Sequence, residues 1–242
     1  MADRRRALPP RLAAVAALVP RGARVADVGT DAGLLALGLL DSGRADYCVA
    51  SDRAAAGLDI AARRGVPYLA AGRLHLRHGD GLDVLSRADA VDVVVVAGLG
   101  ARSIERILVP DRLERLGVRR VVVQPQTDPR RVRRWLCSAG LGIVAERLAR
   151  ERGRDYVAIA ATRGAAAARA WRPTLPDDDL LDAGPFLVAS GDPLVRAHWQ
   201  RELRRLDRVL DRARGGARRG AAARRRLALR VLARLSGSAR SV

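Results

Sequence analysis

The residues best suited to chemistry lie first in the stretch VADVGTDAG, which contains Asp27, Gly29, Asp31 and Gly33. Their spacing, Asp-x-Gly-x-Asp-x-Gly, falls at a predicted junction between a strand and a helix. Glycines there let the backbone approach a ligand closely, and the helix that follows presents amide N–H groups to a carboxylate or phosphate. We therefore predict a loop that binds a small molecule, with an aspartate where dinucleotide-binding sequences usually carry another glycine.

Two more carboxylates follow the next two predicted strands. Asp52 ends the stretch YCVASD, where it can accept both hydroxyls of an adenosine ribose. Asp80 stands between Gly79 and Gly81 in HGDGL, where it can accept a hydrogen bond from the exocyclic amine of adenine. A helix cap for Asp52 and a turn aspartate for Asp80 are the ordinary alternatives. Acids after three successive strands meet at one edge of a parallel sheet, which favours a shared adenosine ligand.

The sign of these charges selects among adenosine ligands. Asp27 and Asp31 would repel a pyrophosphate, whereas S-adenosylmethionine carries a sulfonium and no phosphate. After the fourth predicted strand, Ala97, Gly98 and Gly100 leave space for a methyl donor. The sequence there contains neither the N/D-P-P-Y/W element of exocyclic amine methylation nor a Pro-Cys nucleophile. A purine ring nitrogen, which needs little beyond an in-line approach, is therefore the expected acceptor.

The elements that must position these residues alternate between short apolar runs and helical stretches. Runs such as VDVVVVAG are continuously apolar, as expected for a strand covered by helices on both faces. This predicts a doubly wound parallel sheet, followed by an antiparallel pair joined through ERGRD. By analogy the arrangement is the Rossmann-like seven-stranded sheet of class I methyltransferases. The predicted strands are 24–28, 47–51, 74–78, 91–96, 118–123, 143–150 and 156–162.

A second, helical domain is predicted after a connector over residues 163–185. Two apolar stripes at helical spacing, separated by the glycine break GGARRG, predict an antiparallel helical hairpin of coiled-coil type. We expect residues 1–164 to form a domain that binds S-adenosylmethionine and residues 165–242 to form the hairpin domain. The stripes consist of Leu194, Trp199, Leu203, Leu206 and Leu210, and of Leu227, Val231, Leu232 and Leu235.

The chain is strongly basic, with a formal net charge of +19, and all 45 of its basic residues are arginines. Fifteen of them lie from Arg196 onward, against three acids. A GC-rich coding sequence can raise arginine content by itself, and a solvated helix face is the ordinary reading of such a segment. Concentrated like charges nevertheless repel one another unless an anion offsets them, so we predict that the hairpin contacts RNA.

The cellular compartment follows from the cysteines and the N-terminus. Cys48 and Cys137 lie in a predicted strand and a predicted helix, so neither a disulfide scaffold nor a zinc cluster is expected, and a reducing cytoplasm fits. The N-terminus has the outline of a signal peptide, but prolines interrupt its short apolar run. We predict an amphipathic helix over residues 11–19 and no membrane span.

Several of these stretches, in the same order, resemble the bacterial tRNA adenine-22 N1-methyltransferase (TrmK) family. They are RLAAVAALVPRGARVADVGTDAGLL, HGDGL, VVVAGLG, VVVQPQTDPRRVRRWL, ERGRDYVAIA, GPFL and DPLVRAHWQRELRRLDRVL. The similarity runs from about Leu8 to Leu210.

The resemblance implies a cytoplasmic enzyme that methylates tRNA with S-adenosylmethionine, without a metal or a membrane; we expect a monomer. It also implies roles for particular residues. Asp31 is the expected catalytic residue, either as acid/base or through its charge. The cofactor would be held by Asp27, Gly29, Thr30 and Gly33 around methionine, Asp52 at ribose, Gly79, Asp80 and Gly81 at adenine, and Ala97, Gly98 and Gly100 beside the sulfonium.

This sequence departs from the family pattern near the expected target pocket. Ala32 replaces a histidine, Leu34 an aromatic residue, Ala36 a proline, Ala101 a glycine and Gln126 an asparagine. Two alternatives to the leading hypothesis therefore stay open. One is a tRNA-binding protein that has lost methyl transfer, and the other is a methyltransferase for another RNA or a small molecule.

Overall fold

The computed structural model describes residues 7–164, 171, 178–212 and 214–237. They belong to two compact units, Met1–Arg172 and Pro173–Val242. Trp171 pairs with Ile143 of the sheet, so the first unit extends beyond the predicted boundary at residue 164.

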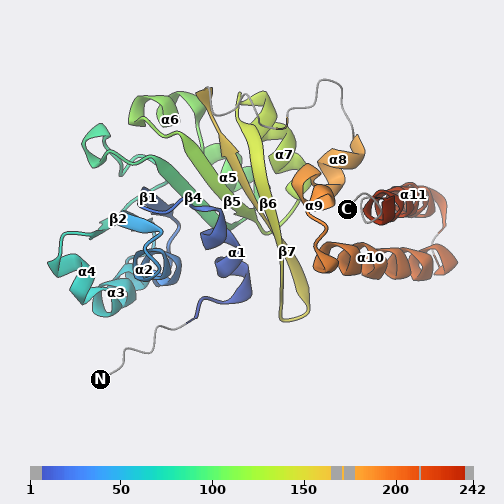
Figure 1. Ribbon diagram of the computed structural model, residues 1–242, viewed down its shortest axis with the longest axis horizontal. Helices are drawn as coiled ribbons and strands as arrows, with labels where there is room; N and C mark the ends of the chain where they lie inside the picture. Colours follow the sequence, from blue (N-terminus) through green and yellow to red (C-terminus); the bar gives the residue numbers. More distant parts are fainter. Residues whose placement is uncertain (1–6, 165–170, 172–177, 213, 238–242) are drawn as a thin grey trace. The chain divides into compact units, whose positions relative to one another are not determined.

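The first unit is built on a seven-stranded sheet with the order β3-β2-β1-β4-β5-β7-β6 (Figure 1). β1 to β5 are parallel, and β7 pairs antiparallel with both β5 and β6. The prediction of seven strands ending in an antiparallel pair is confirmed. The bounds are β1 Ala23–Val28, β2 Ala45–Asp52, β3 Leu74–His78, β4 Val93–Leu99, β5 Arg120–Pro125, β6 Gly142–Glu151 and β7 Arg154–Thr162.

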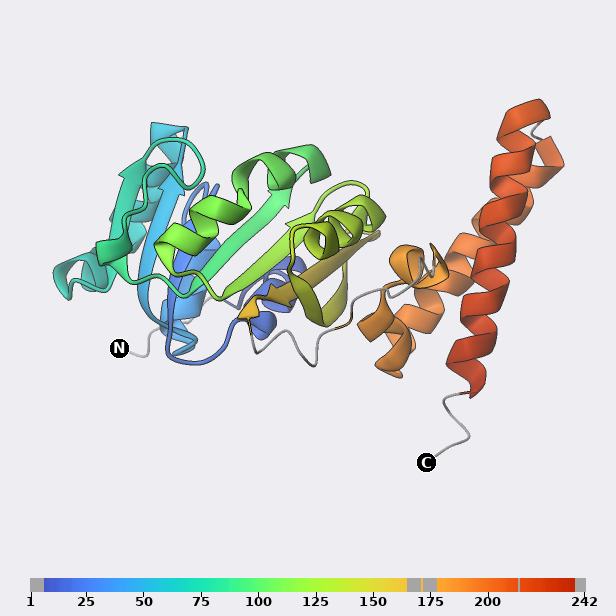
Figure 2. The same cartoon turned by 90° about the horizontal axis from the view of Figure 1, so that it is seen from above.

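Helices cover both faces of this sheet (Figure 2). α1 and α2 lie on one face, and α5, α6 and α7 lie on the other. Burial on both faces explains the valine-rich strands, since Val93 to Val96 and Val121 to Val123 are almost wholly inaccessible to solvent. The helices are α1 Pro10–Leu18, α2 Leu34–Asp41, α3 Ala55–Arg64, α4 Val66–Ala70, α5 Ala101–Ile107, α6 Pro110–Leu116 and α7 Pro129–Ser138, with a short 3₁₀ helix at Arg87–Asp89.

The N-terminal apolar run forms α1, as predicted. Leu12, Val15 and Leu18 are buried in the core beneath the sheet, so this run is part of the folded unit. Within the described residues, the structure contains no helix that is both long enough and apolar enough to span a bilayer.

Gly65 follows α3 directly as its C-cap residue, with a φ of −95° that lies outside the left-handed region. A Cβ at this position would lie 2.5 Å from Leu74 Cδ2 on β3. The absence of a Cβ at Gly65 therefore allows α3 to end in close contact with Leu74.

A buried ion pair joins α7 and β6. Arg133 Nε lies 2.6 Å from Glu146 Oε1, and the two side chains are 1% and 0% exposed. Charges so deeply buried are tolerated only when they are paired.

The second unit is a helical hairpin with two short helices before it, α8 Asp178–Ala183 and α9 Pro185–Ala189. α10 Pro193–Arg212 and α11 Gly215–Gly237 lie side by side (Figures 1 and 2). The predicted hairpin is confirmed, and its core contains Trp199, Leu206, Leu227, Val231 and Leu235.

Two details of the second unit differ from expectation. α8 forms inside the predicted connector, whose residues 165–170 and 172–177 lie outside the described residues. The stretch GGARRG is also no break, because it forms the first turns of α11. Gly216 and Gly220 each weaken a helix by about 1 kcal/mol relative to alanine, and packing of the long helix against α10 offsets that.

Candidate active site

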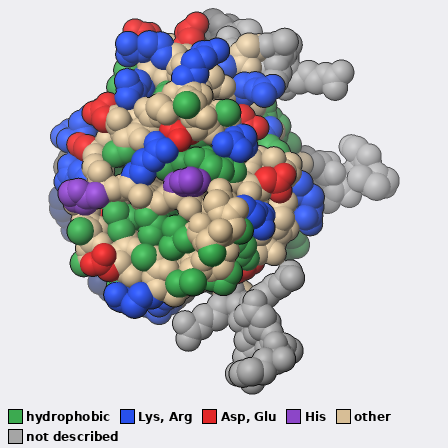
Figure 3. All heavy atoms as spheres, turned by 90° about the vertical axis from the view of Figure 1, so that its left-hand side faces the viewer, with side chains coloured by type: hydrophobic (Ala, Val, Ile, Leu, Met, Phe, Trp, Pro, Cys, Tyr) green, Lys and Arg blue, Asp and Glu red, His purple; other side chains and the backbone are tan. Residues whose placement is uncertain are grey.

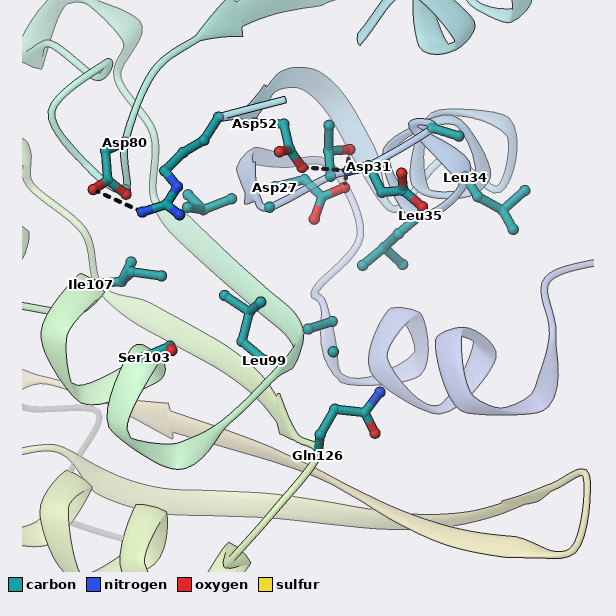
Figure 4. A pocket seen from close by; sticks show the side chains of 18 of the residues that line it. Asp27, Asp31, Leu34, Leu35, Asp52, Asp80, Leu99, Ser103, Ile107 and Gln126 are labelled. Atoms are coloured by element: carbon teal, nitrogen blue, oxygen red, sulfur yellow. Dashed lines mark hydrogen bonds and ion pairs between the residues drawn. The ribbon is translucent and has the colours of Figure 1, made fainter. Parts of the chain in front are cut away.

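A cavity of about 550 Å³ opens at the carboxyl ends of β1 to β4, as predicted for a sheet of this type (Figure 4). Its volume lies within the usual range for small-molecule sites. The lining contains Arg11, Leu12, Asp27, Val28, Gly29, Thr30, Asp31, Ala32, Leu34, Leu35, Asp52, Arg53, Gly79, Asp80, Gly81, Ala97, Gly98, Leu99, Ser103, Arg106, Ile107 and Gln126.

Asp27 is the most deeply placed acid of the cavity. Its side chain is 2% exposed, and burial raises its pKa from 3.8 to about 6. The Thr30 hydroxyl donates to Asp27 Oδ2 over 2.7 Å and, together with the backbone N–H of Ala36 in α2, opposes that rise. The start of α2 thus faces a carboxylate of the protein itself, which leaves no need for a ligand phosphate at this point.

Asp31 lies in the loop with its backbone in the left-handed region, at a φ of +52°. Its N–H donates to Asp52 Oδ2 over 2.8 Å, which fixes this conformation. On the other side, Gly57 of α3 packs on the carbonyl of Asp31, where a Cβ would lie 2.7 Å from the oxygen. The loop is therefore held by two elements, and the carboxylate of Asp31 is exposed at the cavity.

Asp52 accepts hydrogen bonds from two backbone N–H groups. Besides the N–H of Asp31, its carboxylate accepts the N–H of Ala54, the residue that precedes α3, over 2.9 Å. The helix-cap reading is wrong, because Ala54 stands at the N-cap of α3 and no side chain of the described residues caps this helix; the contact from Ala54 instead closes a turn just before it. A carboxylate offers about four lone-pair sites, so two protein contacts leave capacity for ribose hydroxyls.

Asp80 stands across the cavity from these residues, 3.6 Å from Arg53 Nη1 (Figure 4). Both side chains are more than half exposed, at 58% for Asp80 and 65% for Arg53. An exposed pair of this kind contributes little to stability. Both groups are therefore free to rearrange around a ligand.

The predicted glycines divide into two groups. Gly29 and Gly98 line the cavity with φ values of +77° and +79°, where other residues are strained. Gly33 and Gly100, in contrast, are outside the lining. Gly33 instead precedes α2 with a φ of +72°, and a Cβ there would lie 2.6 Å from the Cβ of Ala61. Gly33 therefore supports the loop by allowing it to pack closely against Ala61 of α3.

The sequence did not reveal three arginines of the lining: Arg11, Arg53 and Arg106. The cavity is therefore less acidic than predicted, because three arginines offset most of the negative charge of its four aspartates. Arg11 comes from α1 and donates from Nη1 to the buried Gln124 over 2.9 Å. Its position followed from no motif, because it depends on how α1 packs against the sheet.

The substituted positions do not all reach the cavity. Ala32, Leu34 and Gln126 line it, whereas Ala36 and Ala101 are buried outside the lining. Gln126 follows β5 and lies in Figure 4 on the side opposite Asp27, Asp31 and Asp52. Its N–H donates to the carbonyl of Leu99 over 2.8 Å, which fixes its backbone beside β4.

This sheet order, with a cavity at the carboxyl ends of β1 to β4, defines the Rossmann-like fold of class I methyltransferases. Residues 25–232 match the family described as TrmK, tRNA (adenine(22)-N(1))-methyltransferase. The chain belongs to this family.

Individual relatives agree with that assignment. The tRNA (adenine(22)-N(1))-methyltransferase of Bacillus subtilis is 27% identical over 206 residues, or 83% of each chain. Sp1610 of Streptococcus pneumoniae, a candidate tRNA (m1A22) methyltransferase, is 27% identical, and its structure matches 93% of this chain and 100% of its own with a TM-score of 0.81. Its complex with S-adenosyl-L-methionine matches with a TM-score of 0.79 and the same coverage.

Proposed function

We propose that this protein is a tRNA methyltransferase that transfers the methyl group of S-adenosylmethionine to N1 of an adenine, at position 22 as in its family. The observation that supports this most directly is the family match over residues 25–232, joined to a cavity in which the expected acids meet.

The residues of the cavity suit the cofactor. Bound there, S-adenosylmethionine supplies an electrophilic methyl group on a cationic sulfur. Asp27 offers a buried negative charge near the positive groups of the methionine part, while Gly29 and Gly98 leave the backbone open to it. Asp52 offers its free lone pairs to the ribose, and Asp80 offers its carboxylate to the adenine amine. Arg53, beside Asp80, has a planar cation that can stack on the adenine ring.

We assign the catalytic contribution of the protein to Asp31. As the lone pair of adenine N1 forms its bond to the methyl carbon, the bond from that carbon to sulfur breaks and its electrons stay on sulfur. Positive charge therefore develops on the adenine. The carboxylate of Asp31, held at the cavity by the contact of its N–H with Asp52, stabilises that charge and can accept a proton from the exocyclic amine.

The target adenine must leave its stacked position to reach the cavity. In this proposal Gln126, which lines the cavity, contacts the base with a side chain one methylene longer than the family's asparagine. We further propose that the protein binds RNA through its arginines, works in the cytoplasm and acts as a monomer.

The test is methyl transfer from labelled cofactor to bulk bacterial tRNA, followed by nucleoside analysis. We expect 1-methyladenosine as the product. Asp31→Asn should lower the rate at saturating substrates about 10²- to 10⁴-fold, the usual contribution of such a group, without changing tRNA affinity. Asp59→Asn, an exposed aspartate of α3 outside the cavity lining, is the matched control and should retain the wild-type rate.

The same assay separates the alternatives. Wild-type protein that binds tRNA without transferring methyl groups would be a tRNA-binding protein that has lost turnover, which the replacement of histidine by Ala32 makes worth testing. Another modified nucleoside, or transfer only to a different acceptor, would redirect the function.

A further inference from the structure

The arginines of the helical hairpin differ in whether they have partners. Seven of them are exposed and have no ion pair among the described residues. They are Arg204, Arg208, Arg212, Arg214, Arg218, Arg219 and Arg226, and we call this set the turn surface.

Most of the turn surface surrounds the link between α10 and α11. Arg204, Arg208 and Arg212 are spaced four residues apart, so they follow one face of α10, about 6 Å apart along its axis. Arg214, Arg218 and Arg219 continue across the link into the first turn of α11. Between residues 208 and 219, a single acid, Asp211, accompanies five arginines.

Other arginines of the hairpin are matched by carboxylates. Arg230 makes two hydrogen bonds to Asp179 of α8, at 2.6 and 2.7 Å. Arg205 and Arg224 both bind Glu202, and the contact with Arg205 is the largest cause that lowers the pKa of this carboxyl to about 2. These arginines serve the fold, because their charge is already neutralised inside the unit.

The contrast shows that the positive charge of the hairpin is concentrated rather than uniform. On the face drawn in Figure 3, which carries α3 and α4, arginines and acids are interspersed. Guanidinium groups gathered without counter-ions repel one another, and an external anion relieves that repulsion. The cluster of arginines in the turn surface, unpaired among the described residues, therefore indicates a surface that binds an anionic partner.

We propose that the turn surface binds the phosphate backbone of the RNA substrate. This inference rests on the proposed function for its choice of partner, and it separates the arginines that contact RNA from those that hold the hairpin together. Arginine suits the role, since its fork of N–H donors matches phosphate oxygens.

An anionic membrane is the other polyanion to consider, and the composition of the surface disfavours it. A helix that lies on a bilayer inserts apolar side chains beside its basic ones. Residues 211–220, excluding Ala213, carry only aspartate, arginine, alanine and glycine. Of the hairpin's described residues, Leu229 is the one large apolar side chain that is clearly exposed, and it lies two to three turns beyond Arg219.

The test compares two variants of the full chain with equal charge. The first is Arg212→Gln/Arg214→Gln/Arg218→Gln/Arg219→Gln. The control, Arg63→Gln/Arg64→Gln/Arg115→Gln/Arg119→Gln, removes exposed arginines of the first unit that lie outside the cavity lining. Glutamine keeps helix propensity close to that of arginine, and matching thermal melts would show that both variants fold.

Binding to bulk tRNA is measured from 0.05 to 0.5 M salt. If each of the four arginines neutralises one phosphate, the first variant loses about 3 from the slope of log affinity against log salt. At 0.1 M salt its affinity should fall about a hundredfold or more, whereas the control should change only a few-fold.

Equal slopes for the two variants would overturn the proposal. So would binding of the wild type to phosphatidylserine vesicles that requires the four arginines, combined with unchanged binding to tRNA. Methyl transfer by the wild type is scored separately. If the wild type transfers methyl groups but the two variants have equal salt slopes for tRNA binding, only the turn-surface proposal is rejected. If the wild type transfers no methyl groups but the first variant has the smaller salt slope, only the proposed function is rejected.

Discussion

Replacing Asp27 with asparagine should stabilise the protein while weakening its hold on the cofactor. Burial raises the pKa of Asp27 from 3.8 to about 6, so keeping this side chain ionised in the folded state is unfavourable. A difference of about 2 units corresponds to about 3 kcal/mol at neutral pH, as an order of magnitude. Asparagine carries no charge and removes this penalty.

The effect has a defined dependence on pH. Between about pH 4 and pH 6 the folded protein binds a proton at Asp27 that the unfolded chain has already released. The contribution of Asp27 to the free energy of unfolding is therefore fully present below about pH 4, falls as pH rises, and is lost above about pH 6. The asparagine variant should exceed the wild type by up to about 3 kcal/mol at pH 7, and the difference should shrink toward zero near pH 4.

Thermal unfolding of the two proteins at several pH values measures this difference. For a unit of this size each kcal/mol shifts Tm by about 2 to 4 °C. Titration calorimetry with S-adenosylmethionine gives the other half of the prediction, because wild-type affinity should fall about tenfold per pH unit below about pH 6, and the variant should bind weakly at every pH. A variant less stable than wild type at pH 7, or a difference that is the same at pH 4.5 and pH 7, would refute the reasoning.

Two further predictions concern the support of the site and the core. Gly33→Ala should destabilise by clearly more than 1 kcal/mol, because it adds a clash with Ala61 to the backbone strain; Gly72→Ala, with a φ of +66° and no neighbour within 4 Å, measures the strain alone by denaturant unfolding. Glu146→Leu should cost about 3 to 5 kcal/mol because it removes the carboxylate that pairs with the buried Arg133, and adding Arg133→Met should recover most of that loss. Equal losses for the two alanine variants, or for the single and double variants, would contradict these accounts.

Much of the fold could be predicted because its strands are buried on both faces. Such strands appear as continuous apolar runs, and the helices between them supply the period that separates one strand from the next. The start of α11 could not be predicted in this way. Gly215 and Gly216 normally interrupt a helix, and only packing of the full helix against α10 decides otherwise.

The site was predictable where its residues follow strand ends, since parallel topology alone brings Asp27, Asp52 and Asp80 to one edge. Arg11 and Arg106 reach the cavity from helices, whose rotation on the sheet is fixed by side-chain packing rather than by any local signal. The same limit applies to charge. Sequence gives the number of arginines in the hairpin, but which of them meet a carboxylate depends on how α8, α10 and α11 pack.

Asp52 links the two functions proposed for the cavity. One oxygen accepts the N–H of Asp31 and the other accepts the N–H of Ala54, so the same carboxylate assigned to the ribose also sets the backbone of the residue assigned to catalysis. Because Asp31 has a φ of +52°, losing that contact releases a strained conformation rather than a relaxed one. A change at Asp52 should therefore lower the rate of transfer even at saturating cofactor. A change at Asp80, whose carboxylate pairs with Arg53 rather than with the loop, should be corrected by adding more cofactor.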